Sequence, residues 1–319
     1  MSIVPTVTGT VDSSELGRVL VHEHVFVLGE EYRQNYGDWD EQARVDDAVR
    51  QLDELKSLGI DTILDPTVLG LGRYIPRIQQ IAARTELNIV VATGIYTYND
   101  LPFQFHYNGP GLMMDMPEPM VELFVKDLTE GIAGTGVRAG FLKCAIEEPG
   151  LTPGVERVMR AVGQAAVRTG APITVHTNPH TRSGLVAQRV LREEGADLTR
   201  VVIGHSGDST DLDYLAELAD AGSYLGMDRF GIDVLLPFED RVNTIVELVR
   251  RGYRDKIVIA HDAACFMDWF DPAAKAQIAP KWNYRHISED VLPALLAKGL
   301  TEDDIDTILV RNPRRYFEK

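Results

Sequence analysis

The sequence has few cysteines, no long apolar run and no excess of basic residues. Only two cysteines, Cys144 and Cys265, occur among 319 residues, too few for a disulfide framework. No stretch approaches the ~18 consecutive apolar residues of a membrane helix, and the first residues lack the basic and apolar pattern of a secretion signal. We therefore expect a cytoplasmic protein with no membrane span.

Basic residues are outnumbered by acidic ones. The chain has 32 Lys and Arg against 48 Asp and Glu, which gives a formal net charge of −16 spread along the sequence. Such a field repels phosphate backbones and anionic lipids, so we expect no nucleic-acid and no membrane partner. A neutral or apolar small-molecule substrate fits this charge better.

Short β-branched apolar runs alternate with longer segments that have apolar residues at helical spacing. This alternation is typical of a parallel sheet with crossover helices. Eight such units favour a closed (β/α)8 TIM barrel of the α/β class over an open doubly wound sheet, with residues 1–319 forming one domain. The predicted strands are residues 18–24, 62–66, 88–95, 139–145, 173–176, 201–205, 224–228 and 257–262.

Two segments are too long to be plain connections. Residues 99–119 are rich in Pro, Gly and Met, and residues 263–286 contain two Trp and two Phe. Both follow predicted strands, so both are expected to rise over the catalytic face of the barrel. The alternative for these apolar loops is packing on the barrel or at a subunit interface.

Metal-binding residue types stand at the carboxyl ends of the predicted strands. His22 and His24 end the first strand, His176 the fifth, His205 the sixth and Asp262 the eighth. An isolated His-x-His pair is a weak signal, but these strand ends converge at one face of a barrel. Imidazole nitrogen and carboxylate oxygen are ligands of zinc and similar divalent ions, which predicts a metal site there.

Lys143 lies in a predicted central strand, on the side that the histidines occupy. An inward lysine is costly, and nearby cations would repel it. Reaction of its neutral amine with carbon dioxide would give a carbamate whose two oxygens bridge two metals and reduce their excess charge. The alternative is a lysine whose stem packs inside while its head reaches solvent or an Asp.

Long stretches of the chain resemble the phosphotriesterase family, and within it the phosphotriesterase-like lactonases. The similarity spans nearly the full length. The stretches that carry it are VHEHVF, DPTVLGLGR, VVATGIYTYNDLPF, AGFLKCAIEEPGLT, ITVHT, VVIGHSGDSTDLDYL, GSYLGMDRFGID, VIAHDAAC and NPRRYF.

This resemblance implies a ligand set. His22, His24 and Asp262 would bind the more buried metal, and His176 and His205 the more exposed one. Lys143 would be the carbamylated bridge, and a hydroxide between the metals would be the nucleophile. Zinc suits these ligands, as do iron, cobalt and manganese.

The resemblance also implies catalytic residues. Asp262 would accept a proton from the nucleophile and pass it to the leaving oxygen; the alternative is a pure metal ligand. Tyr96 would lie beside the substrate and donate a hydrogen bond, although strand-end aromatics often only pack. Arg229 would line the pocket, or else pair with Asp228 or Asp233 to hold its loop.

The implied activity is hydrolysis of lactones, including the N-acyl homoserine lactones of quorum quenching, with promiscuous hydrolysis of organophosphate triesters. A homodimer is also implied. The alternatives are a phosphotriesterase proper, another binuclear barrel amidohydrolase, or a barrel that binds metal or a partner without catalysis. Ala263 and Ala264 stand where related lactonases carry a Cys two residues after the Asp, and these smaller side chains are expected to widen the pocket.

Overall fold

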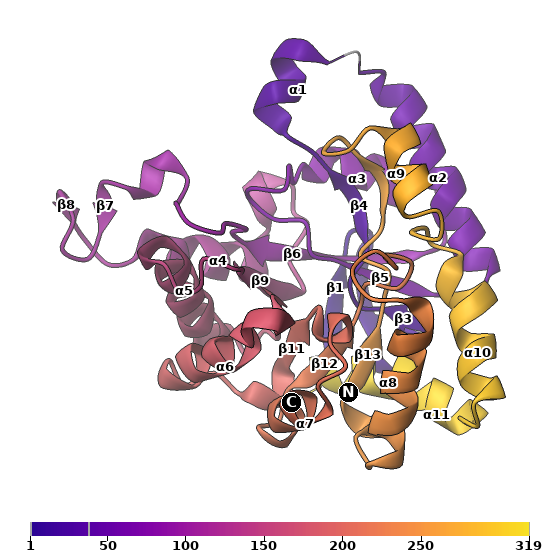
Figure 1. The fold of residues 1–319 in the computed structure, drawn as a ribbon. Helices are drawn as coiled ribbons and strands as arrows, with labels where there is room; N and C mark the ends of the chain where they lie inside the picture. The colour runs from indigo at the N-terminus through magenta and orange to yellow at the C-terminus, as the bar shows by residue number, and fades with distance from the viewer. Residues whose placement is uncertain (1, 38, 319) are drawn as a thin grey trace.

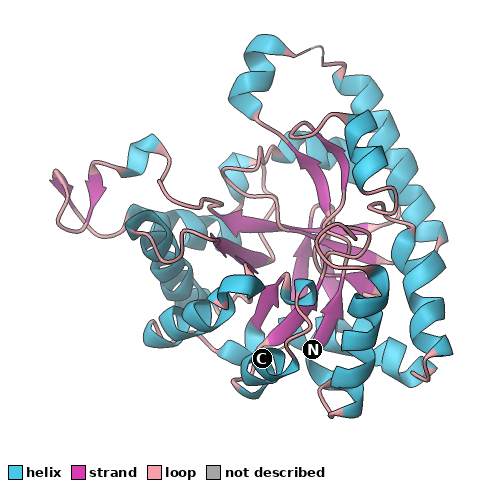
Figure 2. Ribbon diagram, viewed as in Figure 1, coloured by secondary structure: helices cyan, strands magenta, loops and turns pink. Residues whose placement is uncertain are grey.

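The computed structural model describes residues 2–37 and 39–318, which form a parallel barrel surrounded by helices (Figures 1 and 2). Eight strands are hydrogen-bonded in the order β3, β5, β6, β9, β10, β11, β12, β13. Their bounds are β3 (Val19–Leu20), β5 (Thr62–Asp65), β6 (Asn88–Gly94), β9 (Phe141–Ile146), β10 (Ile173–Thr177), β11 (Val201–Gly204), β12 (Tyr224–Met227) and β13 (Ile257–Ile259).

The two ends of this sheet meet and close the barrel. The backbone amide of Val21, just after β3, donates to the carbonyl of Ile259 in β13 over 3.3 Å, and the amide of Asp262 donates to the carbonyl of His22 over 3.1 Å. Together with the parallel order of the strands, these bonds confirm the predicted (β/α)8 barrel.

The first and eighth strands are shorter than predicted. Regular pairing in the first strand stops at Leu20, and β4 (His24–Val27) then pairs with β14 (Ala264–Met267) above the barrel. Between β3 and β4, the amide of Glu23 still donates to the carbonyl of Leu64 in β5 over 3.0 Å. The eighth strand ends at Ile259, and Asp262 lies beyond it in the left-handed conformation with φ 55°.

Helices follow the strands and cover the outside of the barrel (Figure 2). The helix α5 shows why they form: Thr152 caps it by accepting from the amide of Val155, Pro153 opens it, and Gly170 ends it at φ 72°. The helices are α1 (Glu30–Tyr36), α2 (Glu41–Ser57), α3 (Ile75–Ala82), α4 (Pro119–Thr129), α5 (Pro153–Thr169), α6 (Ser183–Glu193), α7 (Leu212–Asp220), α8 (Phe238–Arg250), α9 (Pro272–Ile278), α10 (Leu292–Ala297), α11 (Glu302–Asp306) and α12 (Asn312–Phe317).

None of these helices, in the part of the chain that is described, has the length and apolar character needed to span a membrane.

Two further strands, β1 (Ile3–Thr6) and β2 (Gly9–Asp12), form an antiparallel hairpin. The apolar core fills the space between the barrel and its helices; the apolar face of α5, for example, buries Val155 and Val162.

Only one of the two long segments rises over the barrel mouth as expected. Residues 263–286 form β14 and α9 there. The expectation is wrong for residues 99–119, which carry β7 (Asn108–Gly109) and β8 (Met114–Asp115) and extend outward beyond α4 and α5 (Figure 1). The reason is Arg157 of α5, whose guanidinium donates to the carbonyls of Phe105 and Asn108 and holds the segment outside the barrel.

Gly94 at the end of β6 permits the close approach of the strand that carries Lys143. Gly94 has φ 149°, and a Cβ atom on it would lie 1.8 Å from the Lys143 carbonyl oxygen. We predict that Gly94→Ala destabilises the fold by about 3 kcal/mol or more, since backbone strain and overpacking add together. The control Gly252→Ala meets no atom within 4 Å at φ 91°, and should cost only about 1 kcal/mol. Equal losses of melting temperature in the two variants would contradict this.

Candidate metal centre

A cavity of about 550 Å³ opens at the carboxyl end of the barrel strands. Its floor is polar and its walls are mostly apolar. Five of the six predicted metal ligands line the cavity, together with Tyr96 and Arg229; the sixth, His205, does not. The floor residues are His22, His24, Lys143, His176, Arg229 and Asp262.

The strand ends bring these side chains together from across the barrel. Lys143 lies within β9 and His176 within β10, in register with Gly94 and Gly204 of the neighbouring strands. His205 directly follows β11, and it adopts φ 62°, as Asp262 adopts φ 55° after β13. These two left-handed residues turn the chain at the rim. The side chain of His205 faces His176, and that of Asp262 faces His22 and His24.

His22, His24 and Asp262 form the first group of candidate ligand atoms. Asp262 Oδ1 lies 3.5 Å from His22 Nε2 and 3.3 Å from His24 Nε2. A tetrahedral zinc ion with bonds of about 2.0–2.1 Å holds its ligand atoms about 3.3 Å apart. These two distances match those between ligands of one divalent ion, and all three ligand atoms lie within 4.8 Å of one another.

His176 and His205 form the second group. His176 Nδ1 and His205 Nε2 lie 2.8 Å apart, about 0.5 Å closer than two ligands of one tetrahedral ion. Lys143 lies next to the first group, with Nζ 3.2 Å from His22 Nε2. The donor types and their division into two groups fit a pair of divalent ions, provided that the second group opens slightly.

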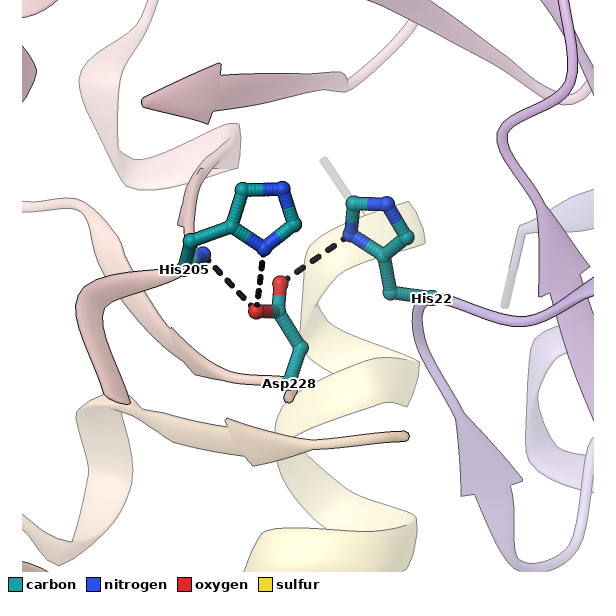
Figure 3. A group of neighbouring side chains, drawn as sticks. All are labelled: His22, His205 and Asp228. Atoms are coloured by element: carbon teal, nitrogen blue, oxygen red, sulfur yellow. Dashed lines mark hydrogen bonds and ion pairs between the residues drawn. The ribbon is translucent and has the colours of Figure 1, made fainter. Parts of the chain in front are cut away.

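Asp228 holds two of the four imidazoles from behind (Figure 3). One of its oxygens accepts from His22 Nδ1 over 3.0 Å, and the other accepts from the backbone amide and Nδ1 of His205 over 2.7 and 2.9 Å. Three donors thus converge on a fully buried carboxylate. With Nδ1 protonated, each ring presents the Nε2 lone pair to the cavity.

His22, His205 and Asp228 also have the composition of a metal-binding triad. Their geometry argues against that role. Both Asp228 oxygens accept hydrogen bonds from ring Nδ1 atoms, so an ion bound there would have to displace these two protons. The ion would also compete with the backbone amide of His205 for one of the two oxygens. We interpret Asp228 as the residue that orients the two histidines.

The remaining two imidazoles are held in a similar way. His24 Nδ1 lies 2.7 Å from the hydroxyl of Thr67, which in turn donates to Asp65. His176 Nε2 lies 3.3 Å from a carboxylate oxygen of Glu147. Each predicted histidine ligand therefore has an oxygen acceptor on one ring nitrogen, and its other nitrogen faces the remaining candidate ligands.

Burial adjusts the protonation of the site. It lowers the pKa of His22 and His205 and brings the pKa of His176 to about 4, so these rings are neutral at pH 7, as metal binding requires. Burial also lowers the pKa of Lys143 from 10.5 to about 8, although Asp262 and Asp228 oppose the shift. A substantial fraction of neutral amine is therefore present near physiological pH.

Arg229 both lines the cavity and holds a carboxylate, but its partners differ from those expected. Its Nε donates to Asp262 Oδ2 over 3.0 Å, and its Nη1 donates to Asp208 over 3.0 Å. The alternative of a pairing with Asp228 or Asp233 is not observed; both oxygens of Asp228 accept hydrogen bonds from the two histidines. Asp262 thus faces the first ligand group with one oxygen and Arg229 with the other.

Tyr96 lies beside the second ligand group. Its ring packs edge-on against His176 at a centroid distance of 5.2 Å, and its hydroxyl is hydrogen-bonded to that of Tyr98. Burial raises the pKa of Tyr96 well above 10, so its hydroxyl stays protonated. Tyr98 was not among the predicted residues, although its hydroxyl lies 3.4 Å from His176 Nε2; its spacing of two from Tyr96 was the available signal.

The cavity walls come mainly from the segments after β12 and β13. Trp269, Phe270 and Ile278 of the second long segment face Val234 and Leu235, which the sequence did not single out. Ala263 and Ala264 are buried and do not line the cavity. The expectation that they widen the pocket is wrong, because the chain turns away at Asp262 and β14 pairs with β4 instead.

A barrel with two groups of cation-binding atoms at its carboxyl end has the layout of a binuclear metallohydrolase, and comparison with known proteins agrees. The profile of the phosphotriesterase family matches residues 2–317. The "phosphotriesterase homology protein" of Mycobacterium tuberculosis (strain ATCC 25618 / H37Rv) is 58% identical and spans 98% of this chain and 97% of its own. The aryldialkylphosphatase of Saccharolobus solfataricus is 41% identical over 97% of both chains.

Solved structures give the same result. The structure described as the phosphotriesterase from Mycobacterium tuberculosis superposes with a TM-score of 0.98 at 57% identity, covering 99% of this chain and 98% of its own. A second structure concerns organophosphate hydrolysis engineered from a weak promiscuous lactonase template; its TM-score is 0.90 at 30% identity, with 99% and 100% coverage. The chain belongs to the phosphotriesterase family, a family of hydrolases that depend on a binuclear metal centre.

Asp228 provides a test of the histidine arrangement. We predict that Asp228→Asn weakens metal binding 10- to 100-fold, because the amide group would turn a donor toward one of the two ring Nδ1 atoms. Titration against a competing chelator measures this. The control Asp220→Asn changes an exposed carboxylate whose partner is the hydroxyl of Tyr253, and should bind metal normally. Wild-type affinity in Asp228→Asn would show that the ring orientation does not depend on this residue.

Proposed function

We propose that this protein hydrolyses lactones, including N-acyl homoserine lactones, and hydrolyses organophosphate triesters more slowly at the same site. The observation that carries the proposal is the form of the cavity: a compact polar floor with two ligand groups, below a deep apolar wall. A lactone ring would lie on the floor, and an acyl chain would lie along the wall formed by Trp269, Phe270, Leu235 and Ile278.

The donor set suits two divalent ions, held by His22, His24 and Asp262 and by His176 and His205. Zinc fits these ligands, and iron, cobalt or manganese are compatible. When bound, such ions generate a hydroxide nucleophile at neutral pH and polarise the carbonyl or phosphoryl oxygen.

The chain's own residues transfer the proton and orient the substrate. Asp262 Oδ2 accepts the proton of the attacking hydroxide, and Arg229, hydrogen-bonded to that oxygen, orients the carboxylate. The proton then passes to the ring oxygen that leaves, so that a lactone and a water give one hydroxy acid. Tyr96, protonated and beside His176, donates a hydrogen bond to the substrate.

Lys143 is proposed to carry a carbamate that joins the two ligand groups. Its amine adds to carbon dioxide and releases one proton, which gives an anion next to His22 in place of a cation. The proposal rests on the burial of Lys143, which is 1% exposed, and on its lowered pKa. An unmodified ammonium at this place would repel both ions.

A homodimer is proposed as the assembly. Residues 99–119 extend from the barrel and carry large exposed apolar side chains, among them Phe103 (71% exposed) and Met113 (82%). The chain otherwise has a net charge of −16, and an exposed apolar segment on such a surface is typical of a protein–protein contact. We propose that a second copy of the chain covers this segment.

A substrate panel tests the proposed activity. We expect the metal-loaded protein to hydrolyse γ- and δ-lactones and acyl homoserine lactones with a higher kcat/KM than paraoxon, since the apolar wall binds an acyl chain. Turnover of paraoxon above that of every lactone would indicate a phosphotriesterase proper. Preferred turnover of amides would indicate an amidohydrolase. Fewer than two ions per chain, with no turnover after reconstitution, would favour the non-enzymatic alternative.

The proposed carbamate makes reconstitution depend on pH. Because the pKa of Lys143 is lowered to about 8, the neutral amine increases with pH up to that value and is constant above it. At a fixed concentration of dissolved CO2, the rate of recovery of metal-depleted protein should rise about tenfold per pH unit below 8 and then level off. The readout is the carbamate signal in the ¹³C NMR spectrum after addition of ¹³CO2. A rate independent of CO2 would contradict the modification.

A further inference from the structure

Glu23 is a fully buried carboxylate that the proposed chemistry does not use. It lies between His22 and His24, with its side chain on the opposite side of the backbone from theirs. One of its oxygens accepts from the backbone amide of His261 over 2.7 Å and from His261 Nδ1 over 2.6 Å. Its other oxygen accepts from the amide of Ala263 over 3.2 Å.

These contacts enclose Asp262. The two amides that Glu23 binds belong to the residues immediately before and after Asp262, whose own amide donates to His22. From the cavity side, the indole Nε1 of Trp282 lies 3.0 Å from the carbonyl oxygens of both His261 and Asp262. Every backbone amide from His261 to Ala263 therefore has an acceptor.

This turn has an unfavourable backbone conformation. Asp262 has φ 55°, in the left-handed region that a residue other than glycine seldom adopts. The surrounding hydrogen bonds must offset the cost of this conformation if Asp262 is to keep Oδ1 directed at His22 and His24. Glu23 supplies the acceptors for both neighbouring amides, and only a carboxylate has two oxygens that accept without donating.

His261 extends the arrangement to the C-terminal helices. Its Nδ1 donates to Glu23, and its Nε2 accepts from the amide of Ile287 over 2.9 Å. The ring is therefore neutral, with its proton on Nδ1. The ring is completely buried.

We propose that Glu23 is a positioning residue that holds Asp262 in its left-handed turn and so shapes the ligand group of His22, His24 and Asp262. This inference rests on the proposed metal centre for its consequence, but its structural part does not. Because the hydrogen bonds of Glu23 go to His261 and Ala263 and not to His176 or His205 of the second group, the two ligand groups should respond differently to its loss.

The test replaces one acceptor oxygen. In Glu23→Gln, the side-chain NH2 meets the N–H of Ala263 or the two donors of His261, so at least one amide loses its partner. We expect the affinity for one of the two ions to fall 10- to 100-fold while the other is retained. In manganese-loaded protein, the electron paramagnetic resonance spectrum of a coupled pair should change to that of a single ion at limiting metal.

Two further variants serve as a control and as a second test. Glu118→Gln makes the same substitution at a largely buried carboxylate that binds Arg157 of α5, outside the cavity, and should retain two ions. Trp282→Phe removes the indole N–H from the opposite side of the turn and keeps an aromatic ring there, although a smaller one. It should weaken the same ion by a smaller factor, and it continues the test if Glu23→Gln does not fold.

The outcomes separate this inference from the proposed function. A crystal structure of metal-free Glu23→Gln should show Asp262 outside the left-handed region, whatever the wild type binds. If the wild type holds fewer than two ions, the metal proposal fails and the position of Asp262 still tests Glu23. Folded Glu23→Gln with an unchanged turn and two ions at wild-type affinity would overturn the inference.

Discussion

The hydrogen bonds that hold the outer nitrogens of the four imidazoles are the constraint on which the rest of the site depends. A buried neutral histidine can present a lone pair in a chosen direction only if its other nitrogen has an acceptor. Asp228 supplies two such acceptors, and Thr67 and Glu147 supply the others. The inner nitrogens consequently face one another and Asp262 across the barrel mouth.

The closed parallel barrel makes this convergence possible. In such a barrel all strands end at the same rim, so residues distant in sequence meet there without long loops. His205 and Asp262 use left-handed turns to reach the centre, and each turn is held by a carboxylate from another part of the chain, Asp228 and Glu23 respectively. The wall above the rim comes from the segments after β12 and β13, whereas the floor comes mainly from the strand ends.

The fold and the predicted ligands were accessible from sequence because they depend on periodicity and residue type. Eight apolar runs predicted eight strands, and the histidines and Asp262 stood at their ends. The partners of these residues were less accessible. Nothing in the sequence pairs Asp228 with His22, or Arg229 with Asp208, since each contact joins different strands. The wrong expectations, for Ala263 and Ala264 and for residues 99–119, arose where the chain changes direction through a left-handed turn or an arginine contact.

Membership of the phosphotriesterase family agrees with this geometry, and the central claim is that two cations occupy the mouth with Lys143 between them. Anomalous diffraction at the absorption edge of the bound metal tests it most directly. The account predicts two peaks, one among His22, His24 and Asp262 and the other beside His176 and His205, with density for a modified Lys143 joining them. A single peak, or an unmodified Lys143 in fully metal-loaded crystals, would contradict it.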